Sequence, residues 1–209
     1  EKRKLTDFGQ FMLKRDFNDE KTWAILLCNL AYSPAFNWYI TNIPFDVDYT
    51  SETAALDLAD ASKHAIGEFW NAFKTILDSN SCLQLIGFGI PEIESKTTKM
   101  GDVKKKMLSL RRTAWMNPDS LTILYSLYKF AEACGGYYQF SLSTLLDDSI
   151  ERDGVSPTRI FGLGEDEMKR ILNGLSSNYP DFISASFTLD LDNITLRSEK
   201  TADDVLQLF

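Results

Sequence analysis

SKHAIGEFWNAFKTIL (residues 62–77), followed by LQLIGFGI (83–90), carries the secondary-structure pattern on which the predicted fold depends. Ser62 is a suitable N-cap, and we expect a helix from Lys63 to Leu77. Its apolar residues recur at the spacing of a helix that turns one face toward a core, and they are Ile66, Phe69, Trp70, Phe73 and Leu77. The second string predicts an extended segment that Pro91 ends.

A polar stretch rich in lysine follows Pro91, and residues 107–115 (MLSLRRTAW) are predicted to form a returning strand. Helices followed by a strand hairpin with a long tip are the order of elements in a winged-helix domain. Upstream, the pattern of caps and apolar residues predicts short helices that begin near Thr6, Asp19, Pro34 and Thr50. Residues 1–117 therefore suggest one winged-helix-like unit.

Residues 118–209 repeat this order. DSLTILYSLYKFAEAC (119–134) predicts a helix that Gly135 and Gly136 stop, and further helices are expected from Ser141 and from Glu165 to about Asn173. Alternation of apolar and polar residues predicts a hairpin from strands 182–189 and 194–197, before a last helix from Ala202. We therefore predict a mainly α fold with short β-hairpins (α+β), built as tandem winged-helix-like units, 1–117 and 118–209, that pack together without a flexible linker.

The composition is that of a folded, acidic chain. It is 44% hydrophobic and 12% aromatic with a net charge of −8, so nucleic acid would be repelled unless positive charge is gathered in one place. Three cysteines without a CxxC pair indicate free thiols and a cytoplasmic protein. No apolar run is long enough to span a membrane. Because the sequence begins at Glu1 without a methionine, we expect a fragment of a longer polypeptide.

Most catalytic sites are excluded by the residues present. His64 is the only histidine, and its place on a helix between Lys63 and Ala65 indicates a solvent-facing or capping residue, so we expect neither a histidine-based triad nor a His/Cys zinc site. The chain has no GxSxG, HExxH or GxxxxGK[ST] string. We therefore expect no catalytic residue, no metal and no cofactor. An enzyme of unrecognised type that uses the carboxylates of Asp147, Asp148 and Glu151 remains an alternative, although these residues also suit a solvated helix end.

One segment departs from the acidic character of the chain. Residues 91–115 carry seven basic and three acidic residues, a net of +4, whereas the remainder carries 15 basic and 27 acidic residues, a net of −12. A basic hairpin can follow the phosphate backbone of DNA without reading bases. A solvated hairpin and a protein interface are the alternatives. The candidate nucleic-acid-binding residues are Lys96, Lys99, Lys104, Lys105, Lys106, Arg111 and Arg112.

The second unit is a poorer candidate for DNA binding. Its helix begins with Glu165, Asp166 and Glu167, which would meet phosphates with negative charge. Lys169 and Arg170 compensate only in part. We expect this half to contact a protein partner or a fused domain.

Several strings resemble an uncharacterised bacterial family found beside, or fused to, phosphoadenosine-phosphosulfate-reductase-like proteins in DNA-modification and phage-defence loci. They are WMNPDSLTILYSLYKFAE (115–132), FSLSTLL (140–146), GVSPTRIFGL (154–163), ILNGLSSNYPDFI (171–183), LDNITLR (191–197) and DDVLQLF (203–209). LTDFGQFML (5–13) is similar to the closing strand and helix of many bacterial winged-helix domains. The resemblance names no catalytic residue. Because the Ser-Gly-Gly loop and the catalytic cysteine of the reductase-like part are missing here, that activity is not expected of these residues.

Taken together, the sequence predicts a non-catalytic adaptor. It would dock a reductase-like or DNA-modification partner and contact DNA through the basic hairpin. A purely structural domain that holds an oligomer or a neighbouring domain together is a further alternative.

Overall fold

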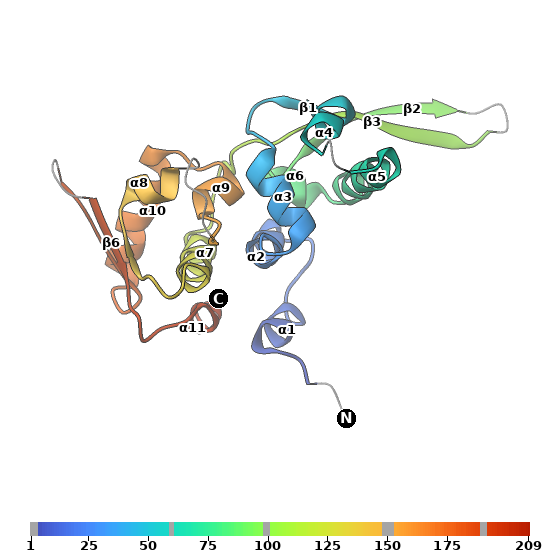
Figure 1. Cartoon of the computed structure of the whole chain (residues 1–209). Coiled ribbons are helices and arrows are strands. Elements are labelled where there is room, and N and C mark those ends of the chain that lie inside the picture. Colours follow the sequence, from blue (N-terminus) through green and yellow to red (C-terminus); the bar gives the residue numbers. More distant parts are fainter. Residues whose placement is uncertain (1–3, 59–60, 98–100, 148–152, 189–191) are drawn as a thin grey trace.

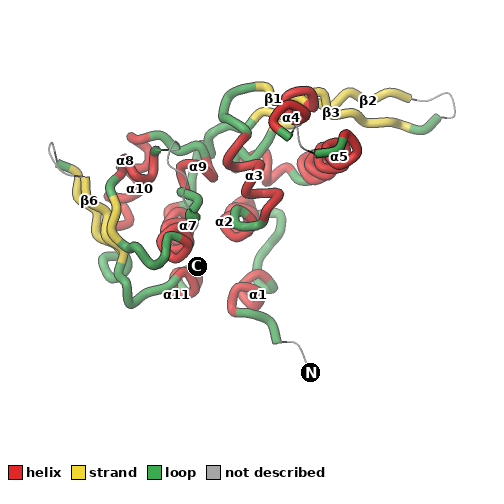
Figure 2. The backbone as a smooth tube through the Cα atoms, viewed as in Figure 1, coloured by secondary structure: helices red, strands yellow, loops and turns green. Residues whose placement is uncertain are grey.

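The described strands form two small sheets that lie on opposite sides of a body of helices (Figure 1). The structure is a computed structural model, and it describes residues 4–58, 61–97, 101–147, 153–188 and 192–209. About half of these residues are helical. Both sheets are antiparallel with three strands, in the orders β1-β3-β2 and β4-β6-β5. The strands are the yellow segments of the tube in Figure 2. The predicted α+β class is therefore confirmed.

Most helices of the first half begin at the polar capping residues that the sequence predicts. The side chains of Thr6, Asp19, Thr50 and Ser62 each accept a hydrogen bond from a backbone N–H of the helix that follows. The elements are α1 (Asp7–Met12), α2 (Glu20–Leu30), α3 (Pro34–Asn42), β1 (Asp48–Thr50), α4 (Ser51–Asp57), α5 (Lys63–Ser79), α6 (Ser81–Leu85), β2 (Ile90–Thr97) and β3 (Val103–Arg111).

The second half is also close to the predicted pattern. Asp119 caps the long central helix, and Gly135 and Gly136 follow its end with positive φ angles. The elements are α7 (Ser120–Ala133), β4 (Gln139–Phe140), α8 (Leu142–Leu146), α9 (Pro157–Phe161), α10 (Glu165–Asn178), β5 (Ile183–Phe187), β6 (Asp192–Leu196) and α11 (Ala202–Leu206). The sequence missed α9, which the Ser156 side chain caps and Pro157 begins.

The expected extended segment from Leu83 to Ile90 is wrong. Asn80 accepts hydrogen bonds from the N–H groups of Cys82 and Leu83 and so begins α6 instead. The strand starts at Ile90 and runs through Pro91, which is tolerated because β2 lies at the edge of its sheet.

The two halves repeat one order of elements. In each, a helix leads to a short strand, then to further helices, and then to a hairpin whose second strand lies between the other two. The first hairpin is the longer one, paired from Ile90↔Arg111 to Thr97↔Val103. Among the described residues only Ser109–Arg111 of β3 also pair with β1. Helix α5 contacts β3 at Lys105 and Met107, and the end of the hairpin beyond them projects from the body (Figure 1).

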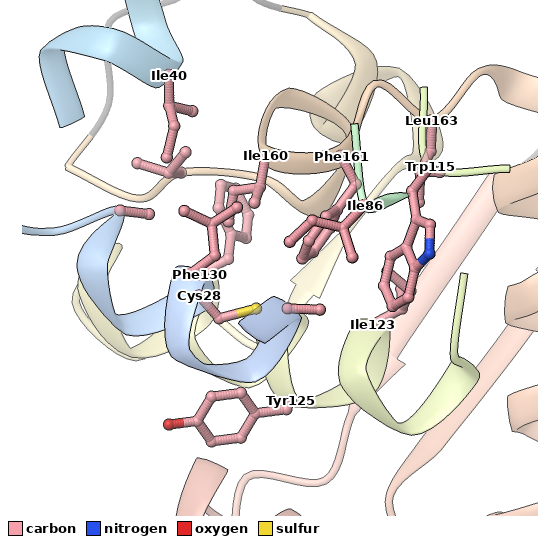
Figure 3. Packing of buried hydrophobic residues seen from close by; sticks show 14 of the residues in the cluster. Cys28, Ile40, Ile86, Trp115, Ile123, Tyr125, Phe130, Ile160, Phe161 and Leu163 are labelled. Atoms are coloured by element: carbon pink, nitrogen blue, oxygen red, sulfur yellow. The ribbon is translucent and has the colours of Figure 1, made fainter. Parts of the chain in front are cut away.

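A single hydrophobic core extends across both halves, which confirms that they pack together. Helix α2 lies against α7, and buried side chains from the two halves meet there (Figure 3). Asn29 and Tyr125 are joined by hydrogen bonds, and Lys21 and Asp119 form an ion pair at 3.0 Å. The boundary near Pro118 stays a prediction. None of the described helices is long and apolar enough to cross a membrane.

Candidate functional site

Two of the predicted basic residues lie directly opposite each other near the end of the projecting hairpin. Lys96 in β2 pairs in register with Lys104 in β3. Like charges at opposed positions of a strand pair are unfavourable. Glu94 offsets this only in part through an ion pair with Lys96 at 3.0 Å, and the Lys96 side chain remains 73% exposed. We call Lys96 and Lys104 the tip pair; it concentrates positive charge at the far end of the hairpin.

Other predicted residues are tied to the body of the protein. The Lys105 Nζ lies 2.6 Å from a carboxylate oxygen of Asp78 in α5. The Arg111 guanidinium donates two hydrogen bonds of 2.8 Å to Asp48, and these bonds lower the pKa of that carboxyl. Neither residue offers a free charge to a ligand.

The remaining predicted lysines are Lys99, Lys104 and Lys106. Within the described ranges, Lys104 and Lys106 are exposed and form no ion pair. Lys104, Lys105 and Lys106 belong to strand β3, which begins at Val103 and not, as predicted, at Met107. Lys99 lies outside the described residues.

The prediction that Arg112 binds nucleic acid is wrong, because its side chain is completely buried and cannot reach a nucleic acid. Its guanidinium lies 4.0 Å from the centre of the Phe45 ring. It donates to carbonyls at the ends of α3 and α9, which have no partner within their own helices. The acceptors, at 2.8 to 3.0 Å, are Ile40, Ile43, Arg159 and Ile160. Arg112 therefore joins the two halves.

A groove with basic and apolar walls lies between α4, α5 and β3. Its volume is about 390 Å³. The walls are formed by Ser51, Ala55, Lys63, Ile66, Gly67, Trp70, Asn71, Lys105, Lys106 and Met107. Sequence reasoning missed this groove because it depends on the packing of three elements. The one local signal of the groove in the sequence is Gly67, a glycine in the middle of a helical pattern.

In the second half, acidic residues at the start of α10 form ion pairs with basic residues of the same helix. Lys169 lies 2.7 Å from Glu165, and Arg170 binds Glu167 and lowers the pKa of that carboxyl. On this exposed surface, each of the two basic side chains is paired with a glutamate of the same helix. It offers no cluster of free cations for phosphate.

The alternative of carboxylate catalysis gains no support. Asp147 caps the end of α8, whereas Asp148 and Glu151 lie outside the described residues. Over the described part of the chain, no group of three or more His, Cys, Asp or Glu could hold a metal. His64 is exposed beside Glu68. Burial raises the pKa of the Cys28 thiol to about 12, which disfavours the nucleophilic thiolate.

Comparison with known proteins adds no family to these observations. No protein-family model, no curated protein and no solved structure matches this chain.

Proposed function

We propose that this chain is a non-catalytic adaptor made of two winged-helix units. The order of elements in each half supports the assignment: a helix, a short strand, further helices and a hairpin, with the first strand paired to the last. In this arrangement α5 and α10 take the place of the recognition helices, and the β2–β3 hairpin is the wing.

The first unit contacts duplex DNA through this wing. The tip pair carries the proposal, because two exposed lysines held opposite each other repel until an anion lies between or beside them. Lysines of this kind bind phosphates without reading bases, so the contact is independent of sequence.

The second unit docks a protein. Its counterpart of the recognition helix starts with three acidic residues, which disfavour phosphate. The resemblance described above makes a reductase-like or DNA-modification partner in a bacterial cytoplasm the expected one, either separate or fused to this chain.

The test is DNA binding by the double variant Lys96→Glu/Lys104→Glu, measured by fluorescence anisotropy of a labelled duplex over a range of salt concentrations. Two lost phosphate contacts should reduce the slope of log K against log salt by about 1.8. The matched control is Lys4→Glu/Lys14→Glu, which makes the same change of charge beside α1, far from the hairpin (Figure 1). Equal binding by the two variants would remove DNA contact from the proposal.

A further inference from the structure

We propose that the groove between α4, α5 and β3 binds an acidic amphipathic helix of a protein partner. This site is distinct from the tip pair, and it goes beyond the DNA contact proposed above. Its occupant lays apolar side chains on the groove floor and carboxylates against the lysines at its edge.

The groove combines an apolar floor with a basic edge. Ile66, Trp70 and Met107 form the floor, with exposed fractions of 8%, 7% and 1%. Lys63 and Lys106 are exposed at the edge, and in the described part of the structure neither forms an ion pair. Among the residues that the structure describes, none of those lining the groove is acidic. A ligand must therefore offer apolar surface and negative charge together.

Gly67 keeps the groove open. It lies within the 17-residue helix α5, where glycine weakens the helix relative to alanine. A Cβ added at Gly67 would meet no atom within 4 Å, so packing does not require glycine there. Because the residue lines the groove, its missing side chain leaves space for a ligand to approach the helix backbone closely.

An acidic helix fits these features better than DNA does. The phosphate backbone of a duplex would pair with the lysines but would leave the apolar floor without a partner. An amphipathic helix has apolar residues at positions i, i+3, i+4 and i+7, which is the usual way in which a helix binds an apolar groove. Carboxylates on its flanks would meet Lys63 on one side and Lys106 on the other.

The experiment is a selection of random phage-displayed peptides on the intact chain, followed by affinity measurement of the enriched peptides by fluorescence polarisation. Three variants accompany it. Gly67→Leu fills the groove, and Lys63→Glu/Lys106→Glu reverses the charge of its edge. Gly174→Leu is the matched control, because Gly174 lies in helix α10 of the other unit and its added Cβ also meets no atom within 4 Å.

We expect enriched peptides that combine apolar residues with Asp or Glu. Filling the groove should weaken their binding on the order of 30-fold, as loss of a central contact does. Charge reversal at the edge should weaken it too, whereas Gly174→Leu and the tip-pair variant should bind as the unaltered chain does. DNA binding should survive Gly67→Leu, so this inference and the proposed function can fail separately.

Two results would overturn the inference. The first is enrichment of peptides without carboxylates, or of peptides that bind Gly67→Leu with unchanged affinity. The second is a concentration-dependent dimer, seen by light scattering, that Gly67→Leu abolishes, because the occupant would then be a second copy of this chain.

Discussion

Replacing Arg112 with alanine is expected to destabilise the protein by about 4 kcal/mol. A buried carbonyl left without its donor costs about 1–3 kcal/mol, and a hydrogen bond to a charged group contributes about 1.5–3 kcal/mol. Here the partners are four carbonyls, two from each half of the chain. The lost side chain also leaves a cavity beside the Phe45 ring. Since total stabilities are about 5–15 kcal/mol, this is a large fraction.

Urea unfolding followed by tryptophan fluorescence measures the loss. The neighbouring Arg111 provides the control, because it is exposed and its side chain pairs with Asp48 at the surface. Arg111→Ala should change the midpoint very little. Arg112→Lys should fall between, since one ammonium group cannot reach the ends of two helices. A loss below about 1 kcal/mol for Arg112→Ala, the value of one ordinary hydrogen bond, would refute the reasoning.

Two further predictions concern other parts of the fold. Gly162→Ala should lower stability by about 1–3 kcal/mol in thermal unfolding, because its φ is +67° and an added Cβ would lie 2.7 Å from the Phe45 ring; an unchanged melting temperature would contradict this. Asp204→Ala should lower the melting temperature near neutral pH and much less in strong acid. Hydrogen bonds from Thr201 lower the pKa of Asp204 below its usual 3.8, so its contribution is present above that value and is lost as the pH falls through the folded-state pKa. A pH-independent difference would speak against it.

Local patterns predicted most of the helices because the signals are themselves local. A capping side chain and an apolar stripe lie within a few residues of each other, as at Ser62 and Asp119. The segment from Leu83 to Ile90 was misread because its apolar run fits a buried strand as well as a short helix. The deciding contact, from Asn80, lies just upstream of the run that was read.

The candidate site was harder to predict because the fate of a charged residue depends on distant partners. Arg111 and Arg112 are adjacent and identical in type, yet one is exposed beside Asp48 and the other is fully buried. The carbonyls that bind Arg112 come from segments about 70 residues before it and about 48 residues after it. No count of charges along the chain contains this information.

The projecting hairpin also affects how readily copies of this protein aggregate. Beyond Ser109, no further strand pairs with the hairpin among the described residues, although Trp70 and Lys74 of α5 donate hydrogen bonds to the β3 carbonyls of Met107 and Lys105. The rest of the two edges is left without a strand partner. An unpaired strand edge can add a strand from another molecule, which leads to aggregation into fibres. Proteins commonly oppose this by placing lysine side chains on the edge. Replacing these lysines by apolar residues would therefore be expected to reduce colloidal stability during expression, whether or not DNA is ever bound.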